Sequence, residues 1–175
     1  MKKLILICGA NGIGKSTVSK ALHSHLPNSA CIDSEYCCSI NPFELNHHTI
    51  ELFKANISAL MMNSLACDFI ETVIFPYGFH GPRKDIFDSV IQTLRNSPIE
   101  FELHPVILEC EESENIRRMR NDNRDEKRIE RAITHSRSIY DDLDYPRINT
   151  TDLTVTETMD RILKLISVCP NAPRT

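Results

Sequence analysis

The first apolar run of the chain, Leu4–Cys8, leads directly into a stretch that matches the motif G-x-x-x-x-G-K-[ST]. The stretch comprises Gly9, Ala10, Asn11, Gly12, Ile13, Gly14, Lys15, Ser16 and Thr17. In this motif a loop joins a strand to a helix, so the match predicts a strand–loop–helix unit at the start of the chain. Glycines let successive backbone N–H groups turn inward, which makes a cradle for a phosphate.

Each constrained position of the motif has a chemical task. Lys15 can reach the β- and γ-phosphates of a nucleoside triphosphate, and the Ser16 hydroxyl can ligate Mg²⁺. The N-terminus of the following helix adds a partial positive charge aimed at the same anion. The alternative is a strand–helix turn that binds nothing. Agreement at all constrained positions, in the correct context after a strand, favours a nucleoside triphosphate site.

Composition narrows the class of protein. The 175 residues fit one domain, expected over 1–169 and followed by a disordered tail over 170–175. A formal charge of -4 disfavours nucleic acid as a partner, and no apolar run approaches the roughly 18 residues of a membrane span. The seven cysteines are odd in number and irregularly spaced, which indicates free thiols in a reducing cytoplasm.

Strand-like and helix-like patterns alternate along the chain, which indicates a parallel sheet covered by helices on both faces. The expected strands are 4–8, 29–33, 72–75, 101–110 and 147–149, and the expected helical stretches are 15–26, about 48–67, 85–95, 112–142 and 155–168. Pro105 weakens the fourth strand, since proline cannot donate to a central ladder. Ligands of such sheets bind at the carboxyl ends of the strands.

Three polar residues follow the second and third expected strands and are candidates for binding a second substrate. Asp33 could accept a hydroxyl proton, position an acceptor or hold Mg²⁺ through water, and Glu35 is a weaker candidate for the same tasks. Arg83 could clamp an anionic group. The alternatives are a turn-capping role for Asp33 and solvent-exposed positions for Glu35 and Arg83.

The stretch 111–131 is dense in charge, with seven basic and seven acidic residues. Its arginines at 117, 120, 124, 128 and 131 are three or four residues apart and would share one face of a continuous helix. The run Asn121–Asn123 could break that helix into two arms, as suits a mobile lid over about 111–138. We therefore expect a lid that contacts phosphate, with a solvated helix face laced by ion pairs as the alternative.

With these pieces in place, the chain resembles the nucleoside- and nucleotide-kinase branch of P-loop proteins. That branch includes adenylate-, shikimate- and gluconate-kinase-like enzymes and chloramphenicol phosphotransferase. The matching features are the loop at 9–17, the strand-end acid Asp33, the stretch Gly81–Asp85, the spacing Arg120-x-x-x-Arg124, and Tyr140–Asp142 followed by Ile148–Thr154.

The resemblance implies a three-layer α/β/α P-loop NTPase fold with a five-stranded parallel sheet and a helical lid. It also implies ATP and Mg²⁺ as cofactors, phosphoryl transfer to a small-molecule acceptor, and a catalytic set of Lys15, Asp33, Arg120 and Arg124. Two departures stand out. The third strand ends in Phe75-Pro76, where many P-loop proteins carry a Walker-B aspartate, and the segment 36–68 resembles no particular member.

Three functions remain open at this point. The first is an ATP-dependent kinase of a nucleoside, nucleotide or other hydroxyl metabolite. The second is a polynucleotide 5′-end kinase, which the acidic net charge disfavours. The third is a nucleotide-binding regulator without transfer activity, which the absent Walker-B acid favours. The sequence leaves the acceptor, the preference for ATP over GTP and the oligomeric state unspecified.

Overall fold

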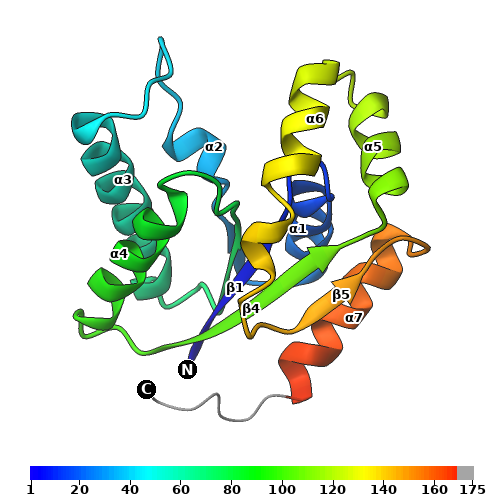
Figure 1. Cartoon of the computed structure of the whole chain (residues 1–175). Coiled ribbons are helices and arrows are strands. Elements are labelled where there is room, and N and C mark those ends of the chain that lie inside the picture. The colour runs from blue at the N-terminus through cyan, green and yellow to red at the C-terminus, as the bar shows by residue number, and fades with distance from the viewer. Residues whose placement is uncertain (169–175) are drawn as a thin grey trace.

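The computed structural model describes residues 1–168, so Cys169 and the expected tail 170–175 lie outside the described residues. Strands and helices alternate as the sequence predicts (Figure 1). The strands are β1 Lys2–Gly9, β2 Ser29–Cys31, β3 Thr72–Pro76, β4 Phe101–Glu109 and β5 Arg147–Asn149. The helices are α1 Lys15–His25, α2 Ser34–Cys37, α3 His47–Ala66, α4 Arg83–Arg95, α5 Glu112–Asn121, α6 Glu126–His135 and α7 Val155–Val168, with a 3₁₀ turn at Ser138–Tyr140.

The five strands form one parallel sheet in the order β2-β3-β1-β4-β5, which confirms the predicted α/β fold. Strand β1 lies in the middle, with Leu6 opposite Phe75 of β3 and Pro105 of β4. The loop after β1 therefore leaves the centre of the sheet at its carboxyl edge, where ligands bind in open α/β sheets.

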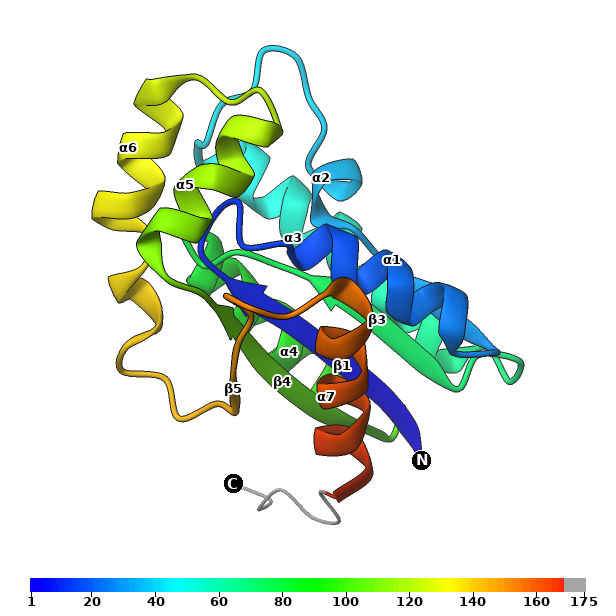
Figure 2. The same ribbon diagram turned by 90° about the vertical axis from the view of Figure 1, so that its right-hand side faces the viewer.

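Helices cover both faces of the sheet. Alternate residues of β1 point to opposite sides, so its apolar side chains must be covered on both faces. Leu4 and Leu6 belong to the core under α3 and α4, whereas Ile5 and Ile7 belong to the core under α1 and α7. Figure 2 shows the pair α5–α6 standing above the carboxyl edge of the sheet, beside the loop that follows β1. Within residues 1–168, no helix combines the length and apolar character that a bilayer crossing needs.

Pro105 lies inside β4 without breaking it. Ile107 donates its backbone N–H to Pro146 O, towards the side where β5 lies. Pro105 is two residues earlier and faces the same side, but β5 pairs only with 107–109 of β4. The missing N–H of Pro105 therefore falls beyond the end of the neighbouring strand, where the sheet does not require a donor.

Two predicted boundaries need correction. The strand expected over 29–33 ends at Cys31, because Asp33 instead caps the short helix α2 by accepting a hydrogen bond from Glu35 N. The helical stretch expected over 112–142 is divided into α5, α6 and a 3₁₀ turn. The first break falls at the predicted Asn121–Asn123, where Asn123 adopts a left-handed φ of 55° and Asp125 then caps α6.

Candidate active site

The loop between β1 and α1 is shaped by glycines at positions where a side chain would collide. A Cβ on Gly9 would overlap Leu108 O on β4, and a Cβ on Gly12 would overlap the Met119 side chain on α5. Both residues also have positive φ values, 141° and 76°. The loop is therefore packed against two neighbours while its backbone stays close to the pocket.

Lys15, the first residue of α1, folds back over this loop. Its Nζ donates to Gly9 O and Ala10 O, each at 2.9 Å. Burial, together with the positive charges of Arg124 and Arg83, lowers the pKa of Lys15 to about 8. Three cations thus converge on one place, which is favourable only when an anion lies between them.

Ser16 and Asp33 meet at the carboxyl ends of β1 and β2. Ser16 Oγ donates to Asp33 Oδ2 at 3.3 Å, while Asp33 Oδ1 accepts the Glu35 N–H at 3.0 Å. The turn-capping role of Asp33 is therefore confirmed, and the same side chain also faces the phosphate loop. Its role towards an acceptor or Mg²⁺ stays a prediction.

This oxygen pair fits Mg²⁺. Mg²⁺ takes hard oxygen ligands and usually keeps several waters, so one or two protein groups plus phosphate oxygens are sufficient. Among residues 1–168, no group of three or more His, Cys, Asp or Glu side chains could hold a metal by itself. The donors present suit a metal that arrives with its nucleotide.

The loop after β3 forms the opposite wall. Tyr77 and Phe79 are buried in an aromatic cluster, and Phe79 N donates to the Tyr140 hydroxyl at 3.0 Å. Arg83 lies over the Tyr77 ring at 5.7 Å. Burial, with Arg83 and Lys15 nearby, lowers the pKa of His80 to about 4, so this imidazole is neutral at physiological pH.

Arginines of α5 and α6 cover the loop, but they are only partly the ones that the sequence indicated. Between residues 112 and 135, the arginines that line the pocket are Arg117, Arg118, Arg124, Arg128 and Arg131. Arg120 lies outside this set, since its side chain is 61% exposed and pairs with Glu126. Arg117 and Arg120 both belong to α5, so the rotation of this helix decides which arginines line the pocket, and the packing of Met119 against Gly12 fixes that rotation.

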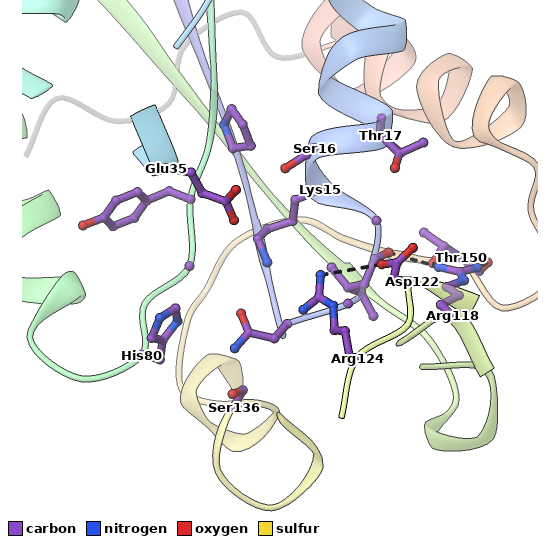
Figure 3. A pocket seen from close by; sticks show the side chains of 18 of the residues that line it. Lys15, Ser16, Thr17, Glu35, His80, Arg118, Asp122, Arg124, Ser136 and Thr150 are labelled. Carbon is purple, nitrogen blue, oxygen red and sulfur yellow. Dashed lines mark hydrogen bonds and ion pairs between the residues drawn. The ribbon is translucent and has the colours of Figure 1, made fainter. Parts of the chain in front are cut away.

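Arg118, which sequence analysis missed, is the most connected of these arginines. It lies beside Thr150 and donates to Thr150 Oγ1 at 3.0 Å and to Thr150 O at 2.7 Å (Figure 3). It also donates to Ile13 O at 3.0 Å, while Glu114 pairs with its Nε. Arg118 thereby ties α5 to the phosphate loop and to the turn before α7. Asn115, three positions earlier on the same helix, is fully buried and also donates to the loop, at Asn11 O.

A single cavity of about 1150 Å³ joins these groups. It is bounded by the phosphate loop, the start of α2, the loop after β3, the α5–α6 pair and the turn before α7. Typical small-molecule pockets have volumes of roughly 300–1,000 Å³, so this one has room for a nucleotide and a second ligand. Of the residues that sequence analysis selected, Lys15, Ser16, Asp33, Glu35, Arg83 and Arg124 line it, whereas Arg120 does not.

Fold and pocket together define a P-loop protein with the fold of the small-molecule kinases. Residues 5–139 match the family model described as the AAA domain, and the chain belongs to this family. None of the curated proteins matches the chain.

Solved structures with similar folds include a resistance protein and two kinases. The tunicamycin resistance protein of Deinococcus radiodurans is 17% identical, with 99% of this chain and 100% of that chain covered and a TM-score of 0.65. A gluconokinase from Sinorhizobium meliloti 1021 is 15% identical over 94% and 91%, with a TM-score of 0.63. Thymidylate kinase from Candida albicans is 14% identical over 95% and 91%, with a TM-score of 0.54. At these identities the likeness concerns the fold.

Proposed function

We propose that this protein is an ATP- and Mg²⁺-dependent phosphotransferase that moves the γ-phosphoryl group to a hydroxyl of a small-molecule acceptor. The observation that carries this proposal is the convergence of Lys15, the Ser16–Asp33 pair and Arg124 in one cavity of about 1150 Å³. The kinase folds among the similar structures support it.

In this proposal the backbone amides of Gly9–Thr17 and the Lys15 ammonium hold the β- and γ-phosphates. The N-terminus of α1 adds its dipole to the same anion. The base of the nucleotide lies against Arg118 and the turn 150–155, which lines the far end of the cavity. When bound, Mg²⁺ would neutralise charge on the β- and γ-phosphate oxygens, with Ser16 as ligand and Asp33 holding its water shell.

Transfer requires in-line placement of the acceptor hydroxyl and stabilisation of the charge on the moving phosphoryl group. Arg124 is placed for the second task because it lines the cavity and lies close enough to Lys15 to lower its pKa. Asp33 is placed to orient the hydroxyl and take its proton. Arg120 is not part of this set, since its side chain is 61% exposed and lies outside the cavity lining, whereas Arg124, paired with Asp122 at 3.6 Å, lines the cavity.

We further propose one kinase domain over 1–169, with a lid narrower than the expected 111–138. Helix α5 is fastened to the phosphate loop by Asn115, Arg118 and Met119, so the part free to move begins after it, at 122–138. The six described cysteines are free thiols, which suits the cytoplasm.

The test is acceptor-dependent ADP release over a panel of nucleosides, nucleotides, sugars, sugar acids and amino alcohols. The wild type should release ADP only with Mg²⁺ and an acceptor, and Lys15→Ala should reduce the rate by more than about a hundredfold. Arg120→Ala is the matched control and should keep the rate within about threefold, since its side chain is exposed and outside the cavity. Full activity of Lys15→Ala would refute the assignment. Tight MgATP binding without ADP release would instead indicate a nucleotide-binding regulator.

A further inference from the structure

The cavity is divided by charge on the two sides of Lys15. On the side of α1, the α5–α6 pair and the turn before α7, the lining includes six basic side chains and two carboxylates. The basic residues are Lys15, Arg117, Arg118, Arg124, Arg128 and Arg131, and the carboxylates are Glu114 and Asp122. On the side of α2 and the loop after β3, the charged lining consists of Asp33, Glu35 and Arg83. Figure 3 shows Glu35 and His80 on one side of Lys15, and Arg118 and Thr150 on the other.

Among the described lining residues, Arg83 is the one cation of this second half, and neutral groups of the protein hold it in place. Arg83 packs on the Tyr77 ring at 5.7 Å and its Nη1 reaches Ser34 Oγ at 3.5 Å. Its charge also depresses the pKa of Lys15, so it faces the place where the transferred phosphoryl group would be. His80 adds no charge there, since burial keeps its pKa far below neutrality. A second anionic group on the acceptor would therefore meet two carboxylates, Asp33 and Glu35, and would compete with the transferred phosphoryl group for the charge of Arg83.

An aromatic ring completes this half of the cavity. Phe43 belongs to the loop between α2 and α3 and stacks on the buried Phe53, with centroids 6.1 Å apart and an interplanar angle of 11°. It lines the cavity and is 53% exposed. A ring fixed on one face and open on the other is a surface on which a flat or apolar ligand can stack.

From these features we propose that the acceptor is an uncharged or cationic hydroxyl compound with a ring or apolar part that packs on Phe43, and not a phosphorylated or carboxylated metabolite. This inference rests on the proposed function. The carboxylates of Asp33 and Glu35 accept hydrogen bonds from the hydroxyl or ammonium groups of the acceptor. The acceptor oxygen forms a bond to the γ-phosphorus, the bond from the γ-phosphorus to the bridging oxygen breaks, ADP leaves, and the hydroxyl proton passes to Asp33.

Matched pairs of acceptors test the charge preference. The pairs are nucleosides against their 5′-monophosphates, polyols against aldonic acids, and amino alcohols against hydroxy acids. The uncharged or cationic member of a productive pair should have a kcat/KM at least about tenfold higher, since an added anion beside Asp33 and Glu35 is repelled. MgATP binding is measured in parallel by calorimetry.

The outcomes distinguish a wrong acceptor class from a wrong kinase function. A higher kcat/KM for the anionic member would overturn the acceptor inference and leave the kinase function standing. Binding of MgATP without turnover of any pair would overturn the kinase function, and the inference with it.

Variants test the stacking surface. Phe43→Ala should raise the KM for the acceptor at least about fivefold with the KM for ATP unchanged, and Phe43→Tyr should restore it. Phe69→Ala is the control, because Phe69 is 70% exposed and lies outside the cavity lining. Equal acceptor KM values for Phe43→Ala and the wild type, with thermal unfolding unchanged, would overturn the stacking role.

Discussion

Lys15 has a pKa that is lowered to about 8, and its side chain has a role both without and with a bound ligand. Without a ligand it donates to the carbonyls of Gly9 and Ala10. A triphosphate would attract the same ammonium group by charge. The depressed pKa reflects burial first, and Arg124 and Arg83 next. An anion between these three cations favours the charged form of Lys15 and so offsets the depression, which links nucleotide binding to protonation of Lys15.

This linkage predicts the pH dependence of nucleotide affinity. With a pKa of about 8 in the free protein, Lys15 is protonated below that pH, and the affinity for MgATP should be nearly constant there. Above it, binding must also take up a proton, so the affinity should fall by up to about tenfold per pH unit. Calorimetry at pH 8.5 in buffers with different ionisation enthalpies should record proton uptake. Lys15→Met should abolish this uptake, and its persistence in the variant would contradict the linkage.

Gly12 offers a second prediction at the scale of single residues, with Gly81 as its control. Both have positive φ values, 76° and 59°, but a Cβ would meet Met119 at Gly12 and nothing within 4 Å at Gly81. Gly81→Ala should therefore lower the free energy of unfolding by about 1–2 kcal/mol through backbone strain alone. Gly12→Ala should cost about 1–3 kcal/mol more through overpacking.

A double-mutant cycle in urea separates these causes. Met119→Ala should remove most of the excess cost of Gly12→Ala, giving a coupling energy above about 1 kcal/mol. Additive effects of Gly12→Ala and Met119→Ala would show that α5 does not press on the phosphate loop.

At the scale of elements, α5 connects parts of the molecule that are distant in sequence. Asn115, Arg118 and Met119 all contact the phosphate loop, and Arg118 also reaches Thr150 before α7. These residues lie three and four positions apart, so they share one side of the helix. In the lid that we propose, α5 is therefore the fixed base, and the part free to move is α6 with the turn 122–125.

Arg117 and Arg118 provide a matched pair for testing this connection. Both bond to Glu114, but Arg117 is 62% exposed and Arg118 is 22% exposed with three bonds to loop and turn atoms. Arg118→Ala should lower the free energy of unfolding by about 1–3 kcal/mol and weaken MgATP binding at least about tenfold. Arg117→Ala should change unfolding by less than about 0.5 kcal/mol. Equal effects of the two substitutions would contradict the fastening role of Arg118.

The contrast between these arginines also shows which features the sequence could predict. The positions of Lys15, Ser16 and Asp33 could be predicted. The phosphate-loop motif places Lys15 and Ser16, and a strand end places Asp33, at the carboxyl edge of the sheet. The rotation of α5 is set by tertiary packing, with Met119 on Gly12, and spacing alone could not distinguish Arg118 from Arg120. The loop with Phe43 follows no regular period, so its place in the cavity could not be predicted either.

At the scale of the whole molecule, the strand order brings the two halves of the cavity together. Because β1 lies between β3 and β4, the phosphate loop is flanked by the segments that follow both neighbours. The segments after β2 and β3 supply Asp33 and Arg83, whereas those after β4 and β5 supply Arg118 and Thr150. A donor on one side and an acceptor on the other would thus meet above the central strand, at Lys15.

The fate of the γ-phosphoryl group tests this account most directly. ATP labelled on its γ-phosphorus is incubated with Mg²⁺, the protein and a fractionated mixture of uncharged and cationic small metabolites, and the products are separated by charge. The account predicts label in a small organic product distinct from inorganic phosphate, formed by the wild type and by Arg120→Ala but not by Lys15→Ala. Label found only in inorganic phosphate, or in the same organic product with Lys15→Ala, would contradict it.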